Sequence, residues 1–191
     1  MRHGKPELDL ETKRGFKISP LELSSMIAEY QQTPLAPDQS PPPSSVNAFQ
    51  HCSIVMSSDL PRAVGSTHLL DKDCNALLDP VFRESSLPHT RWKFRCFSAY
   101  TWCVIFRIAW LFGFSENGEP IGVAKKRADA GALKIIELAH ENGSVVLLGH
   151  GIMLYLIAKT LKRAGWSVTV KNGSRYWSYT VFEFTSPKLQ M

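Results

Sequence analysis

Two histidines lie beside glycines at distant points of the chain, in settings suited to binding an anion. The chain opens with Arg2-His3-Gly4, and much later His150 stands between two glycines. The second block follows the apolar run 144–148 and precedes a helical pattern, so His150 lies where a strand ends and a helix begins. Open α/β sheets place ligand-contacting groups at that point. The sequence therefore predicts that the two histidines share one pocket for an anion.

Two further blocks place polar groups after a short strand. Segment 57–63 reads SSDLPRA and carries Arg62, and an acid stands after the next strand in Arg83-Glu84. A guanidinium presents a fixed fork of donors that matches phosphate oxygens, and a neutral imidazole is a competent nucleophile near pH 7. Together the four blocks carry the groups that phosphoryl transfer needs.

In this order the blocks resemble the motifs of the histidine phosphatase superfamily, also called the phosphoglycerate mutase-like fold. The shared motifs are an RHG triplet, the pattern SS-x-L-x-R-A after a strand, an acidic residue after the next strand and a GHG-type second histidine. The match extends from Arg2 to the strand pattern at 179–184. The resemblance implies an α/β protein with a three-layer α/β/α sandwich and a mostly parallel central sheet.

The resemblance also implies a role for each matched residue. His3 becomes the nucleophile that takes the phosphoryl group, and Glu84 the general acid that protonates the leaving group. His150 is both a catalytic and a phosphate-binding residue, and Arg2 and Arg62 complete the phosphate site. No metal and no other cofactor is expected for this arrangement.

Three other residues near these blocks are weaker candidates. Asp59 lies in the turn before Arg62 and competes with Glu84 for the role of general acid. Ser57 and His89 are candidates for substrate contact, although Ser57 could instead satisfy backbone groups at the end of its strand.

Strand and helix patterns alternate along the chain, as expected of an α/β domain. One domain is expected over 1–191, with an aromatic-rich helical insertion at about 88–120 that either packs on the core or forms a lid. The five prolines of segment 33–45 predict a surface loop without helix. Strands are expected at 53–56, 76–79, 145–148 and 179–184, and helices at 20–31, from 61 to about 70, at 100–111, 121–141 and 152–164.

The start of the chain departs from the family pattern. In the family the RHG triplet ends a central strand, whereas here only Met1 precedes it. Five missing apolar side chains would correspond to roughly 7 to 15 kcal/mol of burial, as much as the net stability of a typical domain. The first strand is therefore expected to be truncated, with the natural start upstream. In the chain as given, His3 is expected on a frayed terminus beside a charged α-amine.

Composition narrows the classes of partner. The net charge of +5 is modest and scattered, which argues against nucleic acid, and the most apolar stretch, 100–114, is too short to cross a bilayer. Four well-separated cysteines predict reduced thiols and a cytoplasmic location, and the charged start excludes a signal peptide. Nothing in the sequence indicates the oligomeric state.

Several functions fit these observations. The first is a phosphatase acting on a small-molecule phosphomonoester or a phosphoprotein. Alternatives are a phosphoglycerate mutase-type phosphotransferase and a catalytically silent relative that binds phosphate. A metal-dependent hydrolase using His3, His150 and Asp59 is disfavoured, because Arg2 and Arg62 would repel a bound cation.

Overall fold

A parallel three-stranded sheet lies at the centre of the protein, of which this computed structural model describes residues 1–8 and 15–184. Its strand order is β3 (Leu77–Leu78), β2 (Ile54–Ser57) and β5 (Val145–Leu148). Ile54 lies opposite Val145, and Ser57 lies opposite Leu148. The two longer strands therefore end at the same edge of the sheet, and the chain segments that follow them meet there.

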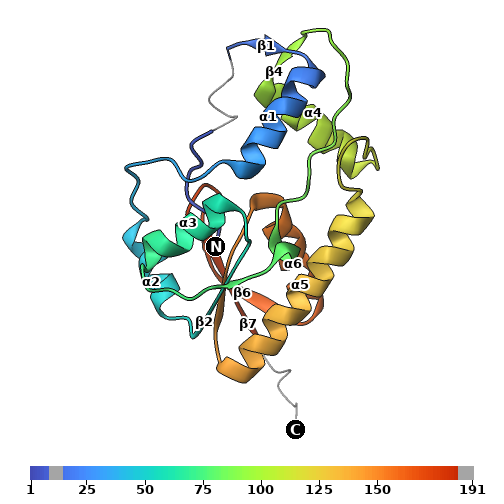
Figure 1. Cartoon of the computed structure of the whole chain (residues 1–191). Helices are drawn as coiled ribbons and strands as arrows, with labels where there is room; N and C mark the ends of the chain where they lie inside the picture. Colours follow the sequence, from blue (N-terminus) through green and yellow to red (C-terminus); the bar gives the residue numbers. More distant parts are fainter. Residues whose placement is uncertain (9–14, 185–191) are drawn as a thin grey trace.

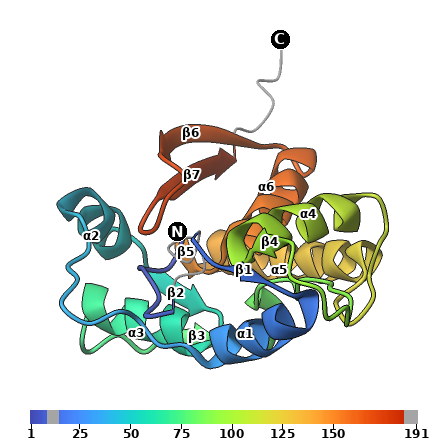
Figure 2. The ribbon, with the colours of Figure 1, turned by 90° about the horizontal axis from the view of Figure 1, so that it is seen from above.

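Helices cover both faces of this sheet (Figures 1 and 2). β5 shows why both need cover, because its side chains alternate between two hydrophobic clusters. Leu147 packs in the cluster of α5 (Ile121–Asn142) and α6 (Gly151–Arg163). Val146 and Leu148 pack in the cluster that includes Phe49 of α2 (Pro43–Gln50) and Leu70 of α3 (Pro61–Leu70). The predicted three-layer arrangement is confirmed.

The first three residues run parallel beside the end of β5. The prediction that His3 lies on a frayed terminus was therefore wrong. The backbone N–H of His3 donates to the carbonyl of Gly149 at 3.1 Å, and its carbonyl accepts from Trp177 at 3.3 Å. The amine of Met1 donates to the Leu147 carbonyl at 2.7 Å, and burial lowers the pKa of this amine to about 5. The expected charged amine is therefore neutral at pH 7, and His3 is held from both sides.

A pair of helices, α1 (Pro20–Gln32) and α4 (Ala99–Leu111), lies to one side of the sheet (Figure 1). The two-residue strands β1 (Lys17–Ile18) and β4 (Phe97–Ser98) pair antiparallel next to them. We call these four elements the cap. The cap has a hydrophobic cluster of its own, made of Leu23, Ile27, Leu87, Ala99, Trp102 and Phe106.

One prediction of secondary structure was wrong, and the strands β1, β4 and β6 were not predicted. The proline-rich segment is not free of helix, because α2 begins at Pro43, where the missing N–H of a first-turn proline costs no hydrogen bond. Strand β6 (Trp166–Asn172) was missed, although its sequence alternates, and it forms an antiparallel hairpin with β7 (Tyr179–Phe184). The short helix η1 (Pro80–Phe82) precedes Glu84. The other predicted elements agree with the structure to within two residues at each end.

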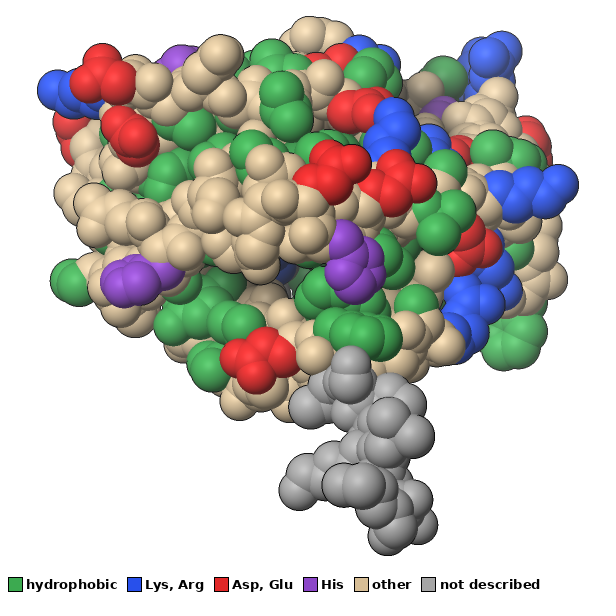
Figure 3. All heavy atoms as spheres, turned by 90° about the horizontal axis from the view of Figure 1, so that it is seen from below, with side chains coloured by type: hydrophobic (Ala, Val, Ile, Leu, Met, Phe, Trp, Pro, Cys, Tyr) green, Lys and Arg blue, Asp and Glu red, His purple; other side chains and the backbone are tan. Residues whose placement is uncertain are grey.

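The face opposite the cap carries acidic, basic and hydrophobic side chains together (Figure 3). No helix within 1–8 and 15–184 combines the length and hydrophobicity that crossing a bilayer requires.

Candidate active site

His3 and His150 lie side by side at the edge where the strands end. Their ring centroids are 4.8 Å apart, and both side chains are buried. His3 arrives from the segment that pairs with Gly149, and His150 is the residue before the first turn of α6. The fold therefore brings together two histidines that are 147 positions apart, as the sequence predicted.

The His3 ring has one nitrogen engaged and is uncharged at neutral pH. Its Nδ1 lies 2.6 Å from the Gly4 carbonyl oxygen. A carbonyl only accepts, so Nδ1 carries the proton and Nε2 carries the lone pair. Burial, and then the nearby charges of Arg62 and Arg2, lower the pKa of His3 to about 3, against the raising effect of the Gly4 bond. The ring is thus in the form that a nucleophile requires.

His150 is also neutral, and its two nitrogens differ. Its Nε2 lies 2.9 Å from Ser58 Oγ. Burial first, and then the electrostatic effects of His3 and Arg62, hold the pKa of His150 well below its ordinary value. Nδ1 is buried and has no hydrogen-bond partner among the described residues. One side of His150 is therefore anchored, and the other carries an unused polar atom.

Arg2 and Arg62 are each oriented by an aromatic ring and a carbonyl. Arg62 Nη1 donates to the carbonyl of Tyr30 at 2.9 Å, and its guanidinium lies 4.4 Å from the centre of the Tyr30 ring. Arg2 Nη1 donates to the carbonyl of Ser174 at 3.1 Å, and its guanidinium lies 4.5 Å from the centre of the Tyr176 ring. These contacts hold both side chains in place and leave several donors unused.

Most of the buried polar atoms without a hydrogen-bond partner belong to these two arginines and to His150. Five buried side-chain polar atoms lack a hydrogen-bond partner within 1–8 and 15–184, and four of them are Arg2 Nε, Arg62 Nε, Arg62 Nη2 and His150 Nδ1. The fifth, Thr90 Oγ1, is not at this site. Leaving a buried polar group unsatisfied costs about 1 to 3 kcal/mol, and more for a charged group. A concentration of such groups fits a site that binds an anion.

Glu84 lies at the start of α6, where it accepts backbone hydrogen bonds. Its Oε2 accepts from the N–H of Ile152 and its Oε1 from the N–H of Met153, each at 3.1 Å. A Cβ at Gly151 would lie 3.9 Å from Arg2 Cζ and 4.0 Å from Glu84 Oε2. Gly151 thus lies between Glu84 and Arg2, and three of the four sequence blocks meet at this point.

Asp59 does not join this group. Its carboxylate accepts from Arg83 Nε at 2.6 Å, and this pair lies outside the cavity beside Arg62 and Glu84. No three His, Cys, Asp or Glu side chains in the described part of the chain gather into a cluster able to hold a metal. The set His3, His150 and Asp59, which the metal-dependent alternative would need, is therefore not brought together.

A cavity of about 410 Å³ separates these residues from the cap. Arg2, Arg62, Glu84 and Tyr176 line it. His3 and His150 are not among the lining residues, although the Tyr176 ring is 5.8 Å from that of His3. The cap supplies the remaining wall. Two lining residues, Ser85 and Leu87, belong to the segment after Glu84. The cap contributes Ile27, Tyr30, Gln31, Tyr100, Cys103, Val104, Arg107, Ile108 and Leu111.

Ser57 and His89 are not among the lining residues. Ser57 Oγ donates to the Ser58 carbonyl at 2.9 Å, as a residue that satisfies backbone at a strand end would do. His89 is buried, and its Nδ1 lies 3.2 Å from the Leu87 carbonyl. The lining therefore does not distinguish these two residues from His3 and His150, which also lie outside it.

Sequence reasoning missed the cap's contribution to the site. Arg107 Nη1 donates to Ser85 Oγ at 2.9 Å, and its Nη2 donates to the Ser85 carbonyl at 3.2 Å. In the sequence, Arg107 stood out only as a single charged residue within an apolar helix. Tyr30 and Tyr176 gave no signal, because aromatic residues at such positions are common in cores. Within the insertion, Trp102 and Phe106 pack in the cap, and the neighbouring stripe of α4 lines the cavity.

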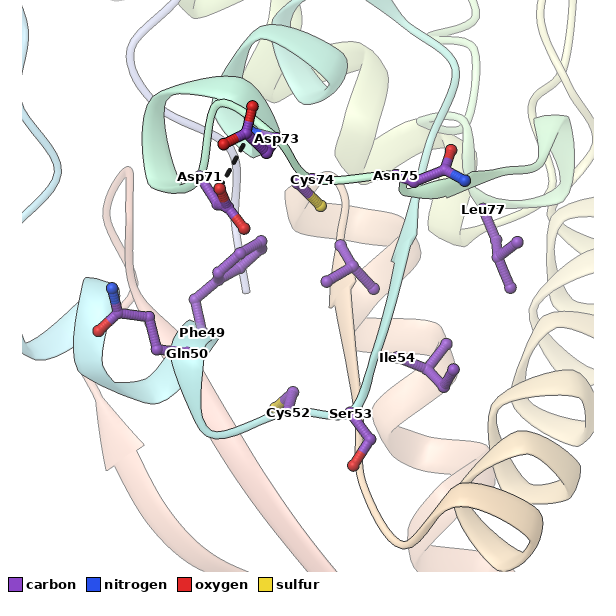
Figure 4. A pocket seen from close by; sticks show the side chains of 11 residues that line it. Phe49, Gln50, Cys52, Ser53, Ile54, Asp71, Asp73, Cys74, Asn75 and Leu77 are labelled. Carbon is purple, nitrogen blue, oxygen red and sulfur yellow. Dashed lines mark hydrogen bonds between the residues drawn. The ribbon is translucent and has the colours of Figure 1, made fainter.

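A second hollow of about 420 Å³ lies at the opposite end of β2 (Figure 4). It is bounded by Phe49, Ile54, Cys52, Cys74 and Asp71 among others, and no histidine, arginine or lysine lines it. Burial raises the pKa of both thiols. This hollow therefore lacks the cations that a phosphate ester needs.

No protein-family model matches the sequence, and no curated protein matches it. Solved structures of several phosphatases do match the fold. Mycobacterial glucosyl-3-phosphoglycerate phosphatase is 18% identical, with a TM-score of 0.56 over 85% of this chain and 77% of that one. A mutant phosphoserine phosphatase from Entamoeba histolytica, in complex with phosphoserine, is 19% identical, with a TM-score of 0.53 over 85% and 77%.

A mycobacterial hydrolase is 18% identical, with a TM-score of 0.57 over 85% of this chain and 78% of that one. At these identities the likeness establishes the fold. The phosphoglycerate mutase-like fold expected from the four sequence motifs is confirmed.

Proposed function

We propose that this protein is a phosphatase that hydrolyses a phosphomonoester through a phosphohistidine on His3. The observation that carries the proposal is the concentration of buried polar atoms without a partner, three on Arg2 and Arg62 and one on His150, around a neutral imidazole. Guanidinium donors match the equatorial oxygens of a phosphoryl group, which carry the negative charge of the transition state. The solved phosphatases that share the fold add support at the level of the superfamily.

In the first step, His3 Nε2 attacks phosphorus as the bond from phosphorus to the ester oxygen breaks. The Gly4 carbonyl keeps the proton on Nδ1, so that Nε2 can form the new bond. As general acid, Glu84 gives a proton to the leaving oxygen, and an alcohol departs. Arg2, Arg62 and His150 hold the phosphoryl oxygens throughout.

In the second step, water attacks the phosphohistidine and His3 leaves with its lone pair restored. Glu84, now a carboxylate, takes the proton from the attacking water. The products are one alcohol and one inorganic phosphate for each ester and water consumed. For either proton transfer Glu84 must exchange a hydrogen bond at the start of α6 for one to the reacting oxygen, because both of its oxygens accept backbone N–H groups there.

The test of the nucleophile compares wild type with His3→Ala on para-nitrophenyl phosphate. We expect the variant to lose essentially all turnover, and rapid acid quenching of the wild type to trap an acid-labile phosphohistidine that His3→Ala lacks. Exposed His68 on α3 provides the control His68→Ala, which should keep full activity. Phosphate binding without any turnover by the wild type would favour the silent relative instead.

The test of the acid uses Glu84→Gln on two esters that differ in their leaving group. Para-nitrophenolate leaves without protonation, whereas an alkoxide needs a proton, and a positioned acid contributes about 10²- to 10⁴-fold. We expect kcat/KM to fall by that factor on an alkyl phosphate and far less on para-nitrophenyl phosphate. Full turnover of the alkyl ester by Glu84→Gln would remove Glu84 from the mechanism.

A further inference from the structure

The cap leaves a row of apolar side chains uncovered inside the same cavity as the phosphate-binding residues. On α4 the lining residues are spaced three or four apart, which places them on one stripe of the helix. Within this stripe Val104 is 40% exposed, Ile108 is 52% exposed and Leu111 is 58% exposed. The helix therefore presents an apolar face that the described protein does not cover.

This face is separate from the one that packs α4 into the protein. Ala99, Trp102, Phe106 and Trp110 make the buried face. A helix of a globular protein usually has one apolar stripe toward the core and polar residues elsewhere. Here a second stripe is apolar as well, which packing of the cap does not require.

The charged residues Arg2, Arg62 and Glu84 line one side of the cavity, and the cap side is mainly apolar although it includes polar residues such as Gln31. Arg2, Arg62 and Glu84 lie beside the buried histidines, and Ile27 and Leu87 join the apolar residues of α4 on the cap side. Arg107 is the one charged residue in the α4 stripe, and its guanidinium is turned to Ser85, next to Glu84. Arg107 lies within the stripe, between Val104 and Leu111, and its side chain is directed to the segment that carries Glu84.

The volume is also larger than a phosphate group needs. At about 410 Å³ the cavity falls within the range of about 300 to 1,000 Å³ that is typical of sites for organic ligands. A phosphate ester of a small, charged hydroxy acid would leave the α4 stripe exposed to water, so the stripe would add no binding free energy. An apolar group would cover that stripe and gain about 0.8 kcal/mol for each methylene removed from water.

We infer that the substrate is a phosphomonoester of an apolar alcohol, with its hydrocarbon part against Val104, Ile108 and Leu111 of α4. This inference rests on the proposed phosphatase activity and specifies its substrate class. The phosphoryl group lies at Arg2 and Arg62, and the ester oxygen points toward the cap. The occupant of the apolar face is the substrate because one cavity contains both the face and the phosphate-binding groups.

The test uses straight-chain alkyl phosphates of increasing length, kept below the concentration at which the longest forms micelles. All release alkoxides of similar basicity, so differences in rate report binding of the chain rather than chemistry. We expect kcat/KM to rise by about two- to fourfold per methylene, the factor that corresponds to at most about 0.8 kcal/mol, until the chain outgrows the cavity. Phosphoserine and 3-phosphoglycerate should be poorer substrates than the longer alkyl esters.

A matched pair of variants locates the effect. Leu111 and Leu133 are both 58% exposed, but Leu133 lies on α5 and does not line the cavity. Leu111→Asn, and separately Ile108→Asn, should flatten the rise with chain length, whereas Leu133→Asn should keep it.

The outcomes separate this inference from the proposed function. Hydrolysis of every ester with no dependence on chain length would overturn the inference and leave the phosphatase activity standing. No hydrolysis of any ester, para-nitrophenyl phosphate included, would overturn the proposed function. A change of oligomeric state in Leu111→Asn with an unaltered chain-length profile would assign the face to a second copy of the chain and overturn the inference as well.

Discussion

The histidine pair is uncharged although it lies in a site built for charge. Burial removes water from both rings, and the guanidinium groups of Arg2 and Arg62 oppose any added positive charge. An anionic substrate would reverse the second effect, because it neutralises the arginines. The same environment that keeps His3 neutral in the free protein would therefore favour a protonated His150 only once phosphate is bound.

This neutrality predicts that the free energy of unfolding falls as the pH is lowered below about 6.5. His3 has a pKa of about 3 when folded and about 6.5 when unfolded, so the unfolded chain takes up more protons between these values. The stabilisation is complete above pH 6.5 and is lost as the pH falls toward 3, at roughly 1.4 kcal/mol per pH unit. The pKa of His150 is also lowered in the folded protein, so His150 adds to this loss of stability as the pH falls. Urea unfolding at pH 7, 6 and 5 measures the slope.

A variant isolates the contribution of His3 from that of other groups. The buried amine of Met1, with its pKa lowered to about 5, adds to the same slope between about pH 8 and 5. His3→Gln keeps a polar side chain of similar size but does not titrate. The free energy of unfolding of this variant should therefore change less with pH, by about the contribution of one titrating group. An unchanged slope in His3→Gln would contradict the assignment of a depressed pKa to His3.

At the scale of elements, the join between Glu84 and α6 links chemistry to folding. The first N–H groups of a helix lack partners within the helix, and a carboxylate that accepts from them stabilises the helix by hydrogen bonding and by its interaction with the helix dipole. No side chain of its own N-cap residue serves α6, since His150 makes no such bond. Glu84 takes that place from another part of the chain.

We therefore expect Glu84→Ala to lower the free energy of unfolding by about 1 to 2 kcal/mol, the range measured for lost helix caps. Glu84→Gln should lower it less, because an amide oxygen can still accept one of the two bonds. Chemical denaturation of the two variants measures the difference. Equal stability of wild type and Glu84→Ala would mean that solvent replaces the cap at no cost.

The elements that carry the motifs could be predicted, and those that shape the cavity could not. His150 and Arg62 each follow a short apolar strand and open a helix, so local pattern and site coincide. Gly4 of the first motif has a tertiary reason that the sequence does not show, since a Cβ there would lie 2.6 Å from Gln39 Oε1 and overlap the Trp177 ring. The α4 wall is different, because its apolar residues look the same in sequence whether they face a core or a cavity.

At the scale of the whole molecule, the site lies where separately packed parts meet. Arg2 comes from the first residues, Arg62 from α3, and Tyr30 from the end of α1 in the cap. Glu84 ties the segment after η1 to α6. A ligand held by these residues would therefore connect the sheet, its two helical layers and the cap, which suits a site that must exclude water around the phosphoryl group.

This arrangement predicts that an anion stabilises the entire fold. A ligand that binds only the folded state adds about 2.7 kcal/mol at a hundred times its Kd, which for a chain of this length corresponds to roughly 5 to 10 °C in Tm. Inorganic phosphate or vanadate, compared with chloride at equal ionic strength, should produce such a shift in the wild type. Arg62→Gln should lose most of it and Arg91→Gln, at an exposed position outside the cavity, should keep it. Equal shifts in both variants would mean that the anion binds elsewhere, and the unused donors of Arg62 would then need another explanation.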